Sequence, residues 1–182
     1  PKGDFGLWNE LAARGHEIMP HGYRHARKSE LPLEEAKGLI LRCLDIFQSE
    51  LKGFSPATAV FNYPYLATTP ELDAWLCGLV RATRGSGPAV NPMPSPSLKS
   101  IGCPTSGPDD CEEDISAKLE AFLAGPGGWF VYCGHGVDGE GWGPVRSAWL
   151  EALLARLVNT PGVRVLPAAK ALALGDAGAF RP

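Results

Sequence analysis

Residues 31–65, LPLEEAKGLILRCLDIFQSELKGFSPATAVFNYPY, place an amphipathic helix directly before a short buried strand. Apolar side chains recur in the first part at the spacing of one helical face: Leu33, Ala36, Ile40, Leu44, Phe47 and Leu51. Pro32 near the start and Gly53 after the end suit the two ends of a helix. The apolar run ATAVF at 57–61 then predicts a strand, so this stretch forms one helix–strand unit.

Similar units on both sides of this stretch indicate the fold class. Helices are predicted at 4–14, 69–78, 110–124, 145–159 and 168–174, and strands at 16–19, 79–83, 129–133 and 163–166. Residues 84–110 are rich in Gly, Pro and Ser and predict a long loop, with one short strand at 98–101. The alternation argues for an α/β fold with a parallel sheet, either open and doubly wound or closed into a (β/α) barrel.

The composition predicts one globular domain, residues 1–182, and argues against some partners. The 182 residues are 45% hydrophobic with a net charge of −3, and lysine and arginine are scattered, so no nucleic-acid partner is expected. The longest apolar runs fall far short of the ~20 residues of a membrane span. Five cysteines without a CxxC spacing favour buried thiols, and a Cys103–Cys111 disulfide is the alternative.

Unusual polar and aromatic residues follow the predicted strands at their carboxyl ends. His21 and His25 come after the first strand, NYPY (62–65) after the second, Arg84 after the third and His135 after the fourth. The carboxyl ends of parallel strands converge on one face, whether the sheet is open or closed. A functional site is therefore expected on that face.

His21 and His25 are candidate metal ligands. Histidines four residues apart on a helical turn point the same way and can chelate one ion. Zinc catalysis commonly uses three protein ligands and an open position, so His135 is either the third ligand or a general acid that stands off the metal. The alternative for the pair is two solvated loop histidines.

Three segments resemble motifs of the NodB-homology polysaccharide deacetylases, carbohydrate esterase family four. LAARGHEIMPHGYRH (11–25) resembles the second motif, in which a GHEI strand leads into H-[S/T]-x-x-H. VFNYPY (60–65) is similar to the third motif, an aromatic-lined turn ending in Pro-Tyr, and WFVYCGHG (129–136) resembles the fifth, a hydrophobic strand leading to a histidine. The order and approximate spacing also fit, so the resemblance covers roughly residues 5–170.

The resemblance implies a distorted (β/α) barrel and a metal-dependent hydrolase that removes N-acetyl groups from an amino-sugar polymer or oligomer. It implies that His21 and His25 bind a divalent ion, most often zinc, together with an aspartate. The backbone N–H of Tyr65 would assist at the oxyanion, and His135 would protonate the departing amine. A carbohydrate is then the expected substrate.

Four residues are candidates for contacts with that substrate: Asn62, Tyr63, Arg84 and Trp142. Trp142 would offer an aromatic face to a sugar ring, or alternatively anchor its glycine-rich loop. The alternative for Tyr63 and for Tyr65 is packing within their own loop. The alternative for Arg84 is a structural or solvated role.

The chain also departs from the family pattern. The aspartate pair of the first motif is missing, and we expect that the domain is incomplete at its N-terminus and lacks its first strand here. Gly22 replaces the Ser or Thr that helps to pin the ligand loop, Asn62 replaces an arginine that orients the base, and Arg84 has no secure counterpart in the fourth motif.

Two alternatives stay open: a degenerate member that binds carbohydrate without hydrolysis, and an amidohydrolase acting on a small cyclic amide. Unpaired cysteines favour the cytoplasm and the resemblance favours an extracytoplasmic location, so the compartment is open as well.

Overall fold

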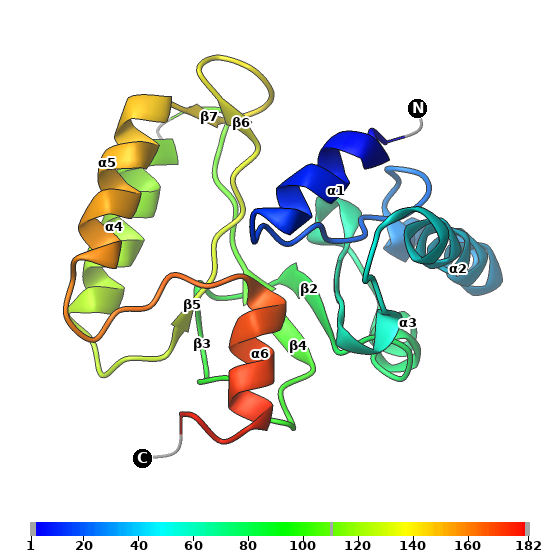
Figure 1. Ribbon diagram of the computed structural model, residues 1–182. Helices are drawn as coiled ribbons and strands as arrows, with labels where there is room; N and C mark the ends of the chain where they lie inside the picture. The colour runs from blue at the N-terminus through cyan, green and yellow to red at the C-terminus, as the bar shows by residue number, and fades with distance from the viewer. Residues whose placement is uncertain (1–2, 110, 181–182) are drawn as a thin grey trace. The chain divides into compact units, whose positions relative to one another are not determined.

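The computed structural model describes residues 3–109 and 111–180, and the chain folds into two compact units. The first unit comprises residues 1–86, 94–101 and 167–182, and the second comprises 87–93 and 102–166. In the described part of the chain six α-helices accompany short strands (Figure 1), which confirms the mixed α/β class. None of the small sheets formed by these residues closes into a barrel.

The first unit contains most of the helices and a three-stranded sheet. Its helices are α1 (Phe5–Ala13), α2 (Leu33–Glu50), α3 (Pro70–Leu76) and α6 (Ala168–Asp176). Its sheet has the order β1 (Val60–Asn62), β2 (Ala82–Ser86) and β4 (Ser100–Cys103), of which β4 contributes its first two residues to this unit. β1 and β2 are parallel, with Asn62 opposite Arg84. This register sets the turn after β1 beside the end of β2.

Helix α2 carries the predicted apolar stripe and joins two parts of the core. One cluster contains buried side chains from α2, β1, α3 and the residues around them: Ala36, Ile40, Leu44, Phe61, Tyr63, Leu72, Leu76 and Val80. The second cluster contains Cys43, Phe47 and Leu51, against which Phe5 and Trp8 of α1 pack. Burying an aliphatic or aromatic side chain of this size contributes about 1.5–3 kcal/mol. The stripe therefore holds both α1 and β1 in place.

Two predicted strands are absent from the structure. The prediction at 16–19 is wrong: the segment forms no strand, although the Asn62 N–H donates to the carbonyl of Pro20 (3.0 Å) and so places the end of the segment beside β1. Proline has no N–H to donate in return, which prevents a ladder at this point. The strand predicted at 163–166 is also absent, and the strand predicted at 79–83 lies three residues further on, as β2.

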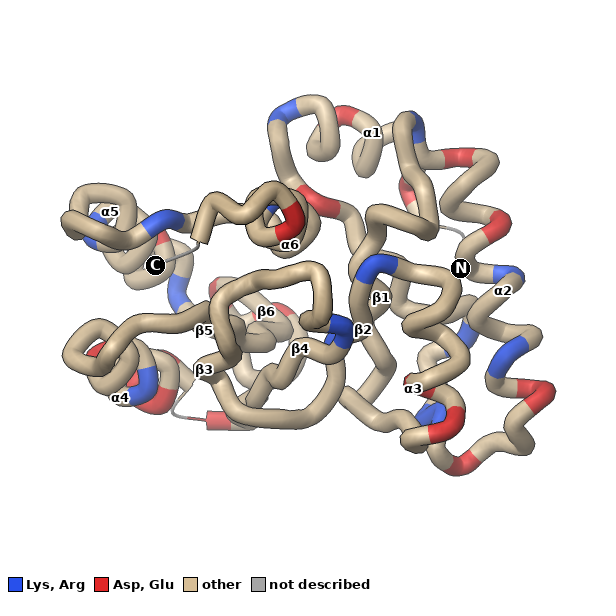
Figure 2. The backbone as a smooth tube through the Cα atoms, turned by 90° about the horizontal axis from the view of Figure 1, so that it is seen from below, with Lys and Arg blue, Asp and Glu red and all other residues tan. Residues whose placement is uncertain are grey.

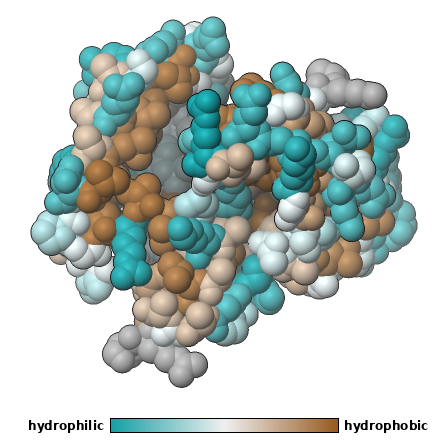
Figure 3. Space-filling view, in the orientation of Figure 1, coloured by the Kyte–Doolittle hydropathy of each residue, from teal (hydrophilic) through white to brown (hydrophobic). Residues whose placement is uncertain are grey.

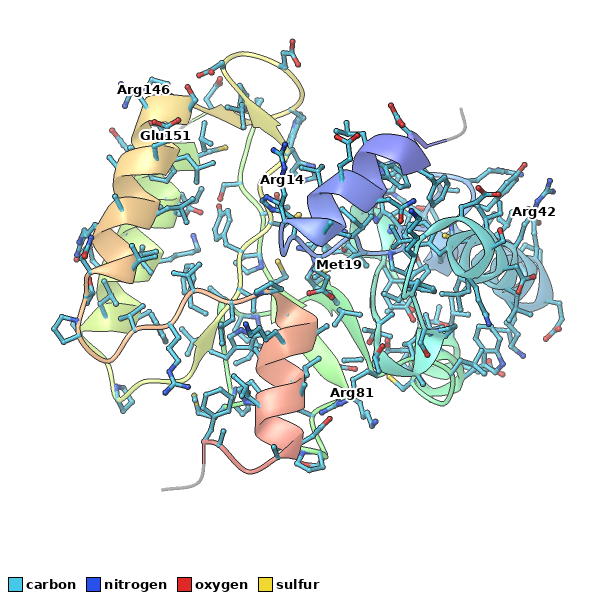
Figure 4. All side chains as sticks on the ribbon, viewed as in Figure 1. Arg14, Met19, Arg42, Arg81, Arg146 and Glu151 are labelled. Atoms are coloured by element: carbon cyan, nitrogen blue, oxygen red, sulfur yellow. The ribbon has the colours of Figure 1, made fainter. Side chains whose placement is uncertain are left out.

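Arg81 ties α6 to the rest of the first unit (Figure 4). Its buried guanidinium donates to both carboxylate oxygens of Asp176, from Nε at 2.9 Å and from Nη2 at 2.6 Å. Nη1 and Nη2 also donate to the carbonyls of Leu98 (2.7 Å) and Ser95 (2.9 Å). A buried charge is tolerated only when it is paired and hydrogen-bonded, and Arg81 meets both conditions.

The second unit is built on two helices, α4 (Cys111–Leu123) and α5 (Ser147–Val158), with two pairs of short strands. The helices lie side by side (Figures 1 and 2) and are joined by the ion pair of Arg156 and Glu120. β3 (Val90–Asn91) pairs antiparallel with β5 (Trp129–Phe130), and β6 (Gly136–Val137) pairs parallel with β7 (Pro144–Val145). β5 thus covers only the first two residues of the strand predicted at 129–133, and its pairing departs from an all-parallel sheet. Hydrophobic residues show over α5 in Figure 3, and Val158 of this helix is 64% exposed.

The distribution of charge and of cysteine agrees with the sequence analysis. Basic and acidic residues are interspersed along both units (Figure 2). No helix in the described ranges combines the length and the apolar character that crossing a bilayer requires. Four cysteines are buried, and the thiols of Cys103 and Cys111 donate to the carbonyls of Pro104 and Ser106 instead of joining in the alternative disulfide.

Candidate functional site

The loop after residues 16–20 brings His21 and His25 together. Their ring centroids lie 5.0 Å apart, with the ring planes inclined by 54°. The four-residue spacing predicts a helical turn, but residues 21–27 form a bent loop, in which Gly22 adopts a φ of +88°. Glycine reaches this left-handed conformation without the steric cost that a side chain adds. The loop therefore achieves the convergence that a helix was expected to provide.

A hydrogen bond fixes the His21 ring. Its Nδ1 lies 2.8 Å from the carbonyl oxygen of Asn62, which can only accept, so Nδ1 carries the hydrogen and donates it. Nε2 then holds the lone pair that a metal ligand needs, and such a bond from the other nitrogen is the usual support of a metal-binding histidine. Burial lowers the pKa of His21, and the charges of His25, Arg84 and Lys28 lower it further, whereas the bond to Asn62 raises it. Burial and the neighbouring charges thus favour the neutral imidazole that binds metal.

The separation of the two ring centroids is compatible with a shared ion. Imidazoles bound to one tetrahedral zinc through nitrogens ~2.0–2.1 Å from the metal have ring centroids about 5.2 Å apart. The observed separation of 5.0 Å fits this arrangement. Across residues 3–109 and 111–180, no cluster of three or more His, Cys, Asp or Glu side chains could hold a metal ion.

Tyr65 lies against the second histidine. Its ring centroid is 4.5 Å from that of His25, and the guanidinium of Arg27 lies 4.6 Å from the same tyrosine ring. Tyr65 and Leu66 adopt φ values of +57° and +54°. Such values are uncommon outside glycine and cost of order 1–3 kcal/mol each, and strain of this kind clusters at functional sites. Tyr65 is also 53% exposed, so this turn presents an aromatic side chain and a constrained backbone beside His25.

The other predicted residues of this turn have different surroundings. Tyr63 is fully buried, with its ring 5.3 Å from that of Phe61, which favours the packing role over contact with a substrate. The side-chain oxygen of Asn62 is buried and accepts no hydrogen bond from the described residues. A buried acceptor left in this way calls for an explanation such as a bound water or ligand. Arg84 lies opposite Asn62 in the sheet, and its charge adds to the effect of burial in lowering the pKa of His21. Burial raises the pKa of Glu17, and the charge of Arg84 offsets part of that rise.

His135 belongs to the second unit, where its ring contacts three neighbouring residues. Nε2 lies 3.1 Å from the Thr105 hydroxyl oxygen and 3.8 Å from the Cys133 sulfur, and the ring meets Trp142 edge-on at 5.1 Å. The Thr105 hydroxyl donates its one hydrogen to the carbonyl of Cys133 (3.0 Å), so it accepts from His135. The hydrogen of the neutral ring is thus on Nε2, which leaves the lone pair on Nδ1.

Trp142 contacts both the histidine and its own loop. A Cβ at Gly107 would lie 2.8 Å from the indole, so the ring packs directly on this glycine. The indole is nevertheless 47% exposed. It therefore serves as a loop anchor and still presents an aromatic surface beside His135, which combines the two alternatives for this residue.

The structure brings the predicted residues together in two groups, one in each unit: His21, His25, Asn62, Tyr63, Tyr65 and Arg84 in the first, and His135 and Trp142 in the second. That His135 joins the histidine pair stays a prediction. Sequence reasoning missed Arg27, Lys28 and Thr105. It also missed Cys133, although this residue lies only two positions before His135 in the sequence.

Comparison with known proteins adds no relative. No protein-family model matches the chain, and no match is found among the curated proteins or the solved structures.

Proposed function

We propose that this chain is a metal-dependent deacetylase that removes N-acetyl groups from an amino-sugar polymer or oligomer, as a divergent member of the NodB-homology family. The resemblance at 11–25, 60–65 and 129–136 supports the proposal. The observation that carries it is the pairing of His21 and His25 at 5.0 Å, with Nδ1 of His21 bound to a backbone carbonyl. The distorted (β/α) barrel of that family belongs to the same proposal.

His21 and His25 are the residues that would hold the divalent ion, for which zinc is the best fit. An ion held there would act as a Lewis acid, because bound zinc polarises a carbonyl and lowers the pKa of a bound water. The chain contributes two imidazoles in one loop, one of them held with Nε2 available. The family resemblance assigns the third protein ligand to an aspartate of the first motif, which is not among the three segments that resemble the family here.

Two groups of the chain would act on the acetamide. The backbone N–H of Tyr65, in a constrained turn beside His25, would donate to the oxygen that gains negative charge. His135 would deliver a proton to the departing amine from Nδ1, because Thr105 occupies its Nε2. A general acid of this kind typically contributes 10²–10⁴-fold to the rate.

Two further residues suit a sugar. The exposed indole of Trp142 provides a flat surface for the apolar face of a pyranose. The buried side-chain oxygen of Asn62 provides an acceptor for an N–H or O–H donor. Both contacts would position the substrate and leave the proton transfers to other groups.

The proposal is tested by measuring metal content and acetate release on the same preparations. The wild-type chain, His25→Ala and His135→Ala are loaded with Zn²⁺ or Co²⁺, dialysed and assayed with chito-oligosaccharides. His25→Ala is expected to lose both the metal and hydrolysis, whereas His135→Ala keeps the metal and loses about 10²-fold or more in acetate release. Unchanged metal content in His25→Ala would overturn the proposal. A wild-type chain that binds metal and chito-oligosaccharide but releases no acetate would support the carbohydrate-binding alternative.

A further inference from the structure

Lys28 is buried beneath the histidine loop. The residue is only 1% exposed, and it is among the largest fully buried side chains of the described chain. Its ammonium donates to the carbonyl of Arg24 at 2.8 Å and to the carbonyl of Ala26 at 3.1 Å. Within the described residues, no carboxylate lies within ion-pairing distance of Lys28. Lysine is almost never fully buried unless it is paired, so these two carbonyls are the partners that account for its position.

The two acceptors flank His25 in the sequence. The carbonyl of Arg24 belongs to the peptide bond that precedes His25, and the carbonyl of Ala26 belongs to the second peptide bond after it. One ammonium therefore fixes the backbone on both sides of a single residue. The backbone torsions of a residue limit the rotamers of its side chain. Holding these carbonyls thus restricts where the His25 ring can point.

Gly22 leaves room for this arrangement. A Cβ at Gly22 would lie 3.3 Å from Nζ and 3.4 Å from Cε of Lys28, and 3.4 Å from the carbonyl oxygen of Arg24. Contacts at 3.3 Å are tighter than ordinary packing, and the φ of +88° disfavours any side chain at this position. Gly22 and Lys28 therefore form a complementary pair inside the loop. Glycine stands where the resembling family has a hydroxyl residue, and the lysine ammonium is the group that donates hydrogen bonds to this loop.

We propose that Lys28 is a positioning residue of the metal centre. Its charged hydrogen bonds to the carbonyls of Arg24 and Ala26 hold His25 at chelating distance from His21 before any ion arrives. This inference rests on the proposed function, because it concerns the same pair of histidines. Charge-assisted hydrogen bonds are roughly twice as strong as neutral ones, so a single buried ammonium can order a short loop.

The test compares the metal affinities of two lysine variants with that of a control. Lys28→Met keeps the length of the side chain and removes all three donors, whereas Lys28→Gln keeps a shorter N–H donor. Arg24→Gln is the matched control, because it removes a neighbouring positive charge and leaves the Arg24 carbonyl in place; the side chain of Arg24 is 60% exposed. Each protein is titrated with Co²⁺, and the visible absorption of the bound ion reports both its affinity and its coordination geometry. Thermal unfolding of the metal-free proteins establishes which variants are folded.

A positioning role predicts that Lys28→Met binds Co²⁺ about 10–100-fold more weakly, as is typical when support of a metal ligand is lost, and with an altered absorption spectrum. Lys28→Gln should fall between Lys28→Met and the wild type, and it decides the question if Lys28→Met does not fold. Arg24→Gln should retain the wild-type affinity. If the folded lysine variants bind Co²⁺ like the wild type, Lys28 only fills space, and the proposed function still stands. If the wild type itself binds no Co²⁺, the proposed function fails and this inference fails with it.

Discussion

The ring of Tyr65 lies 4.5 Å from the ring of His25, and this contact joins two segments that are forty residues apart in the sequence. The tyrosine follows β1, and the histidine lies in the loop after residues 16–20, whose end is bonded to β1 through Asn62 and Pro20. The guanidinium of Arg27 lies at 4.6 Å from the same tyrosine ring. The turn after β1 and the histidine loop therefore support each other.

The backbone of Tyr65 should limit the stability of the protein. At a φ of +57°, a residue with a Cβ is disfavoured relative to glycine by about 1 kcal/mol. Tyr65→Ala and Tyr65→Gly both remove the ring, so they differ mainly in the cost of holding a Cβ at this positive φ. We expect Tyr65→Gly to be the more stable of the two by about 1 kcal/mol in urea-induced unfolding. Equal stabilities would mean that this residue has an ordinary backbone conformation in solution.

The parts of the fold that follow from local pattern could be predicted. The stripe on α2, from Ala36 to Leu51, became the core of the first unit because helical periodicity reports burial directly. The strand at 16–19 could not be excluded in this way, since its absence depends on how Pro20 meets β1. Antiparallel pairing of β5 with β3 also depends on a partner that is distant in the sequence. Such partners are decided by tertiary contacts, which no local pattern records.

The site residues that could be predicted are those whose type and spacing in the sequence already indicate a chemical role. The four-residue spacing of His21 and His25 predicts that their rings lie close together, and they do, although the loop that contains them is not helical. Lys28 could not be found, because a charged residue next to Arg27 in the sequence normally indicates a solvated face. Its burial depends on the carbonyls of a folded loop, and Thr105 likewise meets His135 across thirty residues.

Thr105 should influence the proton transfer of His135 without affecting the metal. Thr105→Val removes the hydroxyl that accepts from Nε2, so the neutral ring can exchange its hydrogen between the two nitrogens. We expect acetate release to fall about 10-fold or more, with zinc content unchanged, because positioned proton transfer contributes 10²–10⁴-fold. Thr105→Ser keeps the hydroxyl and should retain most of the activity. Loss of zinc from Thr105→Val would contradict this assignment.

Asp114 in α4 should give the second unit a dependence on acid pH. Hydrogen bonds from Lys118, Ser106 and Tyr132 lower the pKa of Asp114 to about 2 from its ordinary 3.8. A carboxyl group with a lowered pKa stabilises the folded state above its unfolded pKa, and this contribution is lost as the pH falls through the folded pKa. The difference in unfolding free energy between wild type and Asp114→Asn should therefore be constant above about pH 5 and decrease between about pH 4 and pH 2. Chemical unfolding at a series of pH values measures this difference in free energy. A difference that does not change with pH would show that the pKa of Asp114 is not lowered.

The ion pair of Arg81 and Asp176 should matter far more than the exposed pair of Arg156 and Glu120. Arg81 is buried and donates to two backbone carbonyls as well as to the carboxylate, so Arg81→Met leaves several acceptors without a donor. We expect this change to cost about 2–4 kcal/mol.

Arg156→Met is the matched control for that measurement, because its guanidinium also binds a carboxylate through two nitrogens but lies at the surface. Exposed pairs contribute about 0–1 kcal/mol, since water and salt screen them. Urea-induced unfolding of both variants at low and at high salt gives the comparison. Salt should weaken the contribution of Arg156 and leave that of Arg81 nearly unchanged. Equal losses in the two variants would show that Arg81 exchanges its partners for water in solution. Other contacts, such as the hydrogen bond from the Ala169 N–H to Glu17, would then hold α6 to the first unit.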